Sequence, residues 1–122
     1  MTHRILIVDD DLHIREVIRV ALKKAGMTVF EARDGKEALT RFAADRPDLI
    51  ILDYMLPDIN GNVVCQTIRQ NPNFEHTKII IVSGVVNQDE INDLLKSGAD
   101  EFVKKPFNIE KLIERIGELL AV

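Results

Sequence analysis

Apolar and polar residues alternate in blocks along the chain, and each short apolar run is followed by polar residues. The most regular run, Leu49–Asp53, ends abruptly in an acidic side chain. An apolar run of this length, bounded by turn residues, is typical of a strand buried on both faces of a parallel sheet. From this pattern we predict five strands: Arg4–Val8, Met27–Ala32, Leu49–Asp53, Lys78–Val82 and Ala99–Lys104.

The segments between these strands carry apolar residues at mainly helical spacing. Leu12–Lys24 is the clearest of them, and Gly26 is placed to end it. We predict further helices from Gly35 to before Pro47, over Asn62–Asn71 and Gln88–Lys96, and from after Phe107 to about Val122.

Strands that alternate with helices of this length predict an α/β fold made of parallel βαβ units. Right-handed crossovers then place helices on both faces of the sheet. We expect a doubly wound, flavodoxin-like, five-stranded parallel sheet of order 2-1-3-4-5, folded as a single domain over residues 1–122.

Polar side chains stand at the ends of four of these strands. Asp9 and Asp10 follow the first strand, Asp53 ends the third, Ser83 follows the fourth, and Lys105 follows the fifth. In the predicted order, the first and third strands flank the switch point at which open α/β sheets bind ligands. We therefore expect the three aspartates to meet at one edge of the sheet.

Three negative charges in one crevice require compensation. A divalent cation provides it, and Mg²⁺ suits a site of one or two carboxylates, waters and a phosphate oxygen. Lys105 would add a second positive charge, and Ser83 would add a hydroxyl donor. Phosphoryl transfer onto the Asp53 carboxylate requires these groups, because in-line displacement depends on position and charge neutralisation.

Four motifs, in this order along the chain, resemble the receiver domain of two-component response regulators of the chemotaxis-regulator type: Asp9-Asp10, Asp53–Pro57, Ser83-Gly84 and Lys105-Pro106-Phe107. The resemblance covers the whole chain. It implies a signalling switch that catalyses only its own phosphorylation and dephosphorylation, and not an enzyme with a separate substrate. The implied phosphodonor is a sensor histidine kinase or a histidine phosphotransfer protein.

The resemblance also implies roles for the acidic residues. Asp53 would be the phosphoacceptor and a ligand of Mg²⁺. Asp10 would ligate the ion directly, and Asp9 would act mainly through a bound water. The backbone carbonyl of Met55 would supply another ligand.

Further implied roles fall on the last two strands. Ser83 would bond a phosphoryl oxygen, Lys105 would pair with the phosphoryl group, and the Lys105–Pro106 peptide bond would be cis. On phosphorylation, Ser83 would move toward the phosphoryl group and Phe102 would turn inward. This population shift would couple the site to the face of the fourth helix, fifth strand and fifth helix.

Several positions depart from the commonest pattern of the family. Ser83 stands where threonine is usual, Gly84 where alanine is frequent, and Phe102 where tyrosine is frequent. Met55 and Val85, two residues beyond the acceptor and the serine, are apolar and offer no group to orient water. We therefore expect slow to intermediate self-dephosphorylation.

Each of these residues also has an ordinary structural explanation. Asp11, next to the acidic pair, could cap the first helix. Asp53 could be a turn residue before Pro57, and Lys105 could be a solvated surface lysine. Their joint occurrence at strand ends favours a functional site.

Three other functions compete with the switch. A haloacid-dehalogenase-type phosphatase would use Asp9 as its nucleophile within the Asp9-x-Asp11 pattern, but it needs a later acidic pair and usually a cap. A receiver-like interaction module that takes no phosphate is weakened because every chemical position is filled. A flavodoxin-like cofactor site is disfavoured, since the loop after the first strand is triply acidic.

Composition bounds the location and the partners. The net charge of −4 disfavours nucleic acid and anionic membranes. Cys65 is the single cysteine, which suits a reducing compartment, and no apolar run approaches the roughly 18 residues of a membrane span. We expect a cytoplasmic protein.

The output is open at this stage. We expect no output domain within these residues, so the partner would be a downstream protein target or a fused effector. Asp100, Glu101 and Arg115 could pair across a homodimer or could be surface charge.

Overall fold

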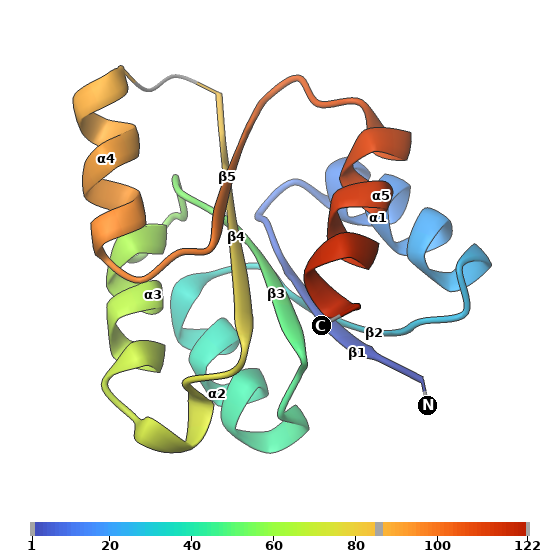
Figure 1. The fold of residues 1–122 in the computed structure, drawn as a ribbon, viewed down its shortest axis with the longest axis horizontal. Coiled ribbons are helices and arrows are strands. Elements are labelled where there is room, and N and C mark those ends of the chain that lie inside the picture. The colour runs from blue at the N-terminus through green and yellow to red at the C-terminus, as the bar shows by residue number, and fades with distance from the viewer. Residues whose placement is uncertain (1, 85–86, 122) are drawn as a thin grey trace.

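The computed structural model describes residues 2–84 and 87–121. In this part of the chain strands and helices alternate as predicted (Figure 1). Their bounds are β1 (Arg4–Val8), α1 (Leu12–Lys24), β2 (Thr28–Ala32), α2 (Gly35–Asp45), β3 (Leu49–Asp53), α3 (Gly61–Arg69), the short 3₁₀ helix η1 (Pro72–Phe74), β4 (Lys78–Ser83), α4 (Gln88–Lys96), β5 (Glu101–Lys104) and α5 (Ile109–Leu120).

Two predicted boundaries differ from the observed ones by about two residues. Helix α3 ends at Arg69 because the chain turns at Asn71, whose side chain caps η1. Strand β5 begins at Glu101 instead of Ala99, since Gly98 takes a left-handed φ of +110° and delays the extended conformation. Val85, to which a role in dephosphorylation was assigned, lies outside the described residues.

The sheet is parallel throughout and has the order β2-β1-β3-β4-β5, which confirms the predicted topology. Every residue of β3 is buried, which explains its uninterrupted apolar run. In the register, Val8 lies opposite Leu52, and Asp53 lies opposite Val82. The carboxyl ends of β1, β3 and β4 therefore meet at one edge of the sheet.

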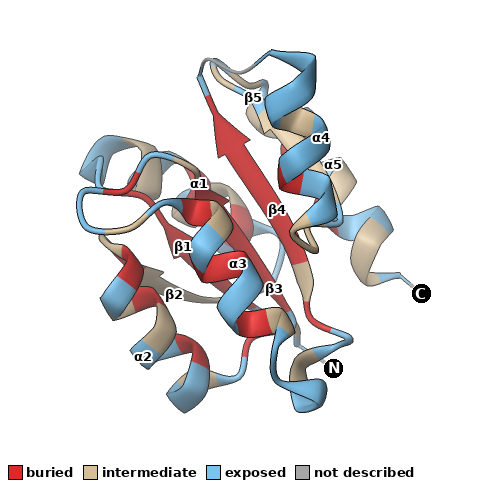
Figure 2. Cartoon of the chain, turned by 90° about the vertical axis from the view of Figure 1, so that its left-hand side faces the viewer, coloured by how far each residue is buried: buried red, intermediate tan, exposed pale blue. Residues whose placement is uncertain are grey.

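Helices cover both faces of the sheet: α1 and α5 lie on one face, and α2, α3 and α4 on the other (Figure 1). Side chains alternate between two cores, so that Ile51 packs with α1 and α5 while Ile50 packs with the other three helices. Figure 2 shows that the inner strands such as β4 are buried, that the edge strands β2 and β5 are only partly buried, and that the outer sides of the helices are exposed. Each fully buried leucine or isoleucine side chain contributes roughly 1.5–3 kcal/mol of transfer free energy. Burial of these side chains stabilises the inner strands, whose carboxyl ends form the edge described above.

Four helices begin at the edge of the sheet where the strands end, and a polar side chain caps the first turn of each. The side chains of the capping residues accept hydrogen bonds from backbone N–H groups in the first turn: Asp11, Asp34, Asn87 and Asn108. The predicted cap at Asp11 is therefore confirmed. In the described part of the chain, no helix combines the length and apolar character needed to cross a membrane.

Candidate functional site

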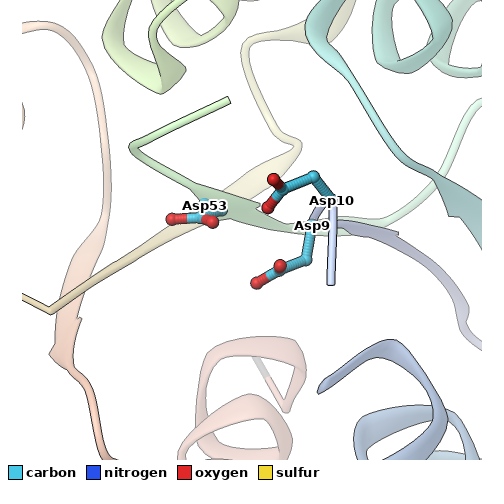
Figure 3. A group of neighbouring side chains, drawn as sticks. All are labelled: Asp9, Asp10 and Asp53. Carbon is cyan, nitrogen blue, oxygen red and sulfur yellow. The ribbon is translucent and has the colours of Figure 1, made fainter. Parts of the chain in front are cut away.

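Three carboxylates lie together at the edge of the sheet. Asp9 and Asp10 follow β1, and Asp53 ends β3, so the order of the strands places them side by side (Figure 3). One oxygen of each carboxylate lies within 4.8 Å of the others. Asp9 and Asp53 are buried, whereas Asp10 is exposed. This is the grouping that the sequence predicts.

Lys105 reaches this cluster from the end of β5. Its Nζ lies 3.0 Å from Asp9 Oδ2 and 3.3 Å from Asp53 Oδ2, and it donates a hydrogen bond to each. The backbone N–H of Lys105 donates to the Ser83 carbonyl, which ties the lysine to the end of β4. Lys105 is therefore a partner of the buried carboxylates and not a freely solvated lysine.

The site is short of positive charge. Burial, and then the negative charge of Asp9, raise the pKa of Asp53 above its ordinary value, although Lys105 and the Met55 N–H oppose the shift. Burial alone would lower the pKa of Lys105, but the hydrogen bonds and charges of Asp9 and Asp53 outweigh it and raise that pKa. One lysine thus compensates two buried carboxylates only in part.

The cluster fits a divalent cation. Carboxylate oxygens are ligands that suit Mg²⁺, and octahedral ligands at about 2.1 Å from the ion lie about 3 to 4.2 Å from one another, within the 4.8 Å that bounds the separations of the aspartate oxygens. Asp53 is buried beside the negative charge of Asp9, the two causes that raise its pKa, so a positive charge placed there would favour the ionised carboxylate. Asp9, Asp10 and Asp53 could therefore hold such an ion.

Ser83 supplies a hydroxyl at the end of β4, the strand that neighbours β3 on the side away from β1. The residue is 1% exposed, and its Oγ has no hydrogen-bond partner among the described residues. Ser83 directly follows Val82, which lies opposite Asp53 in the register of β3 and β4. A buried hydroxyl without a partner is costly, so this oxygen is suited to a ligand.

A seven-residue loop, Tyr54–Asn60, follows Asp53 and leads into α3. The N–H of Met55 donates to Asp53 Oδ1 at 3.2 Å, and the N–H of Gly61 donates to the Tyr54 carbonyl at 2.8 Å. The side chain of Met55 points outward and is exposed. The Lys105–Pro106 peptide bond is cis, as the resemblance implied.

The residues assigned to the switch face are engaged within the chain. Phe102 is half-buried and packs against the core beneath α2, α3 and α4. Asp100 pairs with Arg69 at 2.9 Å, and Glu101 pairs with Arg115. Charges that were considered for a dimer contact therefore already have partners within the chain.

Sequence reasoning did not single out Arg15. Its guanidinium donates to the backbone carbonyl of Asp9 at 2.6 Å and pairs with Glu31 at 3.2 Å, and Glu31 also binds Arg19. The arginine therefore fixes the end of β1 that carries the acidic pair. A usable signal was its place on the first helix, one turn after the predicted cap at Asp11.

The raised pKa of Asp53 predicts a pH-dependent stability difference in metal-free buffer. Because the pKa in the folded state lies above the ordinary 3.8, ionised Asp53 costs stability near neutral pH. We expect Asp53→Asn to increase the free energy of unfolding there by on the order of 1 kcal/mol. The gain should shrink as the pH falls through the folded-state pKa toward about 4. Urea unfolding of both proteins with EDTA checks this, and a gain that is independent of pH would contradict it.

Comparison with known proteins shows a similarity that covers nearly the whole of this chain. The family model of the response regulator receiver domain matches residues 5–117. The response regulator MprA of Mycobacterium ulcerans (strain Agy99) is 40% identical over 120 residues, which cover 98% of this chain and 51% of that protein. The chain therefore spans about half the length of this relative.

Solved structures agree with the family match. The receiver domain of the Francisella response regulator 1452 has a TM-score of 0.89 and 33% identity, covering 97% of this chain and 96% of that chain. The chemotaxis response regulator CheY4 of Vibrio cholerae has a TM-score of 0.92 and 29% identity, covering 98% and 100% of the two chains. Both similarities extend over nearly the whole fold, including the edge that carries the aspartates.

Proposed function

The chain belongs to the response regulator receiver domain family, and from that premise we propose that Asp53 is the phosphoacceptor of a Mg²⁺-dependent signalling switch. One observation carries the proposal. The buried Asp53 carboxylate lies beside Lys105 and within 4.8 Å of Asp9 and Asp10 oxygens, at the end of the central strand. A carboxylate that is costly to bury and is surrounded by charged groups is the part of this fold suited to chemistry.

The cation site would be formed by four residues of this edge. Asp9, Asp10 and Asp53 would hold Mg²⁺ through carboxylates, with Asp9 acting mainly through a water, and the Met55 carbonyl would be a further ligand. Bound Mg²⁺ would neutralise the negative charge that accumulates between the acceptor and the phosphoryl oxygens.

In the proposed transfer, a carboxylate oxygen of Asp53 forms a bond to phosphorus while the bond between phosphorus and the donor breaks. The leaving group, the imidazole of a phosphohistidine or the carboxylate of a small acyl phosphate, departs with that electron pair. Lys105 Nζ pairs with the phosphoryl oxygens, and Ser83 Oγ donates a hydrogen bond to one of them. Lys105 Nζ already lies 3.3 Å from Asp53 Oδ2, whereas Ser83 Oγ would move toward the phosphoryl group.

The response would be a shift of the α4-β5-α5 face. Movement of Ser83 toward the phosphoryl group would let Phe102, now half-buried, turn further inward. The protein would act in the cytoplasm, and its phosphodonor would be a sensor histidine kinase or a histidine phosphotransfer protein. A downstream protein or a fused effector would read the altered face, and this domain itself would not bind nucleic acid.

The phosphatase alternative is not supported by the position of Asp11. A haloacid-dehalogenase-type site would need this residue beside Asp9. Instead, Asp11 accepts hydrogen bonds from His13 and Ile14 and caps α1, and its carboxylate is not part of the acidic cluster.

Intact mass after incubation with acetyl phosphate tests the proposal. With Mg²⁺ present, we expect one phosphoryl adduct per chain. With EDTA in place of Mg²⁺, the adduct should be absent or greatly reduced, because the three carboxylates would then repel the incoming phosphoryl group. A protein that binds Mg²⁺ but accepts no phosphoryl group from this donor or from a histidine phosphodonor would contradict the proposal.

A further inference from the structure

The loop that follows the acceptor is attached to a helix outside the acidic cluster. Asp58 lies in this loop, between β3 and α3, and its carboxylate accepts three backbone N–H groups. Gly35 donates to Oδ1 at 2.8 Å, Lys36 donates to Oδ2 at 2.9 Å, and Ile59 donates to Oδ1 at 2.9 Å. Two of these donors belong to the first turn of α2.

Helix α2 therefore has two caps of different origin. Its own Asp34 accepts only the N–H of Glu37, at 2.8 Å. The N–H groups of Gly35 and Lys36, which a helix leaves without internal partners, are satisfied by the carboxylate of Asp58. The positive end of the helix dipole also favours a carboxylate at this point. These hydrogen bonds, that of Gly35 first, lower the pKa of Asp58.

An apolar contact reinforces the attachment. Gly35 is buried, and a Cβ atom built on it would lie 2.2 Å from Cγ1 of Ile59. The side chain of Ile59 therefore occupies the space that any other residue at position 35 would fill. Polar and apolar contacts from adjacent loop residues thus hold the same turn of α2.

Along the sequence, Asp58 lies only five residues after Asp53, the proposed phosphoacceptor. Three residues before Asp58 stands Met55, whose N–H donates to Asp53 Oδ1. Between them, Leu56 is buried in the core and Pro57 has a fixed φ, so the segment has little freedom to absorb a displacement. A loop released at Asp58 would shift the backbone of Met55.

We propose that Asp58 is a positioning residue: by clamping the Tyr54–Asn60 loop to the first turn of α2, it holds the Met55 carbonyl and the Asp53 carboxylate in place for the divalent cation. This inference rests on the proposed function, because it assumes that these two groups are cation ligands. Substitution of residues that orient metal ligands without touching the metal commonly weakens metal binding by about 10- to 100-fold.

Magnesium titration by calorimetry tests the proposal with a matched control. We expect Asp58→Ala to weaken Mg²⁺ binding by about tenfold, the lower end of that range. Asp34→Ala removes a cap from the same helix without touching the loop, and its Mg²⁺ affinity should equal that of the unsubstituted protein. Equal affinity in Asp58→Ala and Asp34→Ala would overturn the inference and leave the proposed function standing.

Two further variants address the same attachment from different sides. Gly35→Ala, which displaces Ile59, should also weaken Mg²⁺ binding. Asp58→Asn keeps an oxygen acceptor but loses the acceptor for Lys36, and its Mg²⁺ affinity should fall between those of Asp58→Ala and the unsubstituted protein.

In metal-free protein, hydrogen exchange of the Tyr54–Asn60 segment should accelerate in Asp58→Ala but not in Asp34→Ala. Absence of Mg²⁺ binding to the unsubstituted protein would instead overturn the proposed function.

Discussion

Asp53→Asn is expected to reduce phosphoryl incorporation from acetyl phosphate to background. An amide at this position is not a competent nucleophile, and the group that would form the bond to phosphorus is removed. Asp9→Asn should retain slow incorporation, because Asp10, Lys105 and the acceptor itself remain. Incorporation followed by intact mass at matched Mg²⁺ concentration measures both.

A failure to fold cannot explain this loss if the substituted protein is as stable as predicted. Asp53→Asn removes a buried charge, so its unfolding midpoint in metal-free buffer should be higher than that of the unsubstituted protein near neutral pH. If Asp9→Asn abolishes incorporation while Asp53→Asn preserves it, Asp9 is the nucleophile and the assignment of the acceptor is wrong.

Gly61→Ala is expected to lower the free energy of unfolding by about 1–3 kcal/mol. A Cβ at this position would lie 2.6 Å from the backbone oxygen of Asp53 and 2.9 Å from Cα of Tyr54. Both atoms belong to the main chain at the end of the central strand, so no side chain can rotate away to relieve the contact. The same clash displaces the acceptor, and phosphoryl incorporation should fall as well.

Gly117→Ala provides the matched control. Gly117 lies within α5, is exposed, and a Cβ there would meet no atom within 4 Å. Alanine in a helix interior stabilises relative to glycine by about 0.5–1 kcal/mol, so this substitution should raise stability. Thermal unfolding compares the two, at about 4 °C per kcal/mol for a domain of this size. Equal effects of both substitutions would contradict the close approach at Gly61.

The topology and the acidic cluster could be predicted from the sequence because they follow from strand-level patterns. The apolar run Leu49–Leu52, which ends in Asp53, identifies the central strand, and this strand is buried at every position. Once the order of the strands is known, the carboxyl ends of the first and third strands must be neighbours. The meeting of Asp9, Asp10 and Asp53 follows from that geometry alone.

The contacts of Arg15 and Asp58 could not be predicted in the same way. Each joins a side chain to backbone groups of another element, Arg15 to the carbonyl of Asp9 and Asp58 to the first turn of α2. Such contacts depend on how a helix or loop docks in three dimensions, and apolar periodicity carries no information about it. The predicted end of α3 and the predicted start of β5 were each about two residues off for a related reason, because local turns fix these boundaries.

The site of phosphorylation in the unsubstituted protein tests the central claim most directly, because all three carboxylates of the cluster are then present. The protein would be phosphorylated with Mg²⁺ present and treated with borohydride, which reduces an aspartyl phosphate to homoserine. Its peptides would then be sequenced by mass spectrometry. We predict homoserine at position 53, dependent on both Mg²⁺ and the phosphodonor. Homoserine at position 9 or 10, with intact aspartate at 53, would contradict the account.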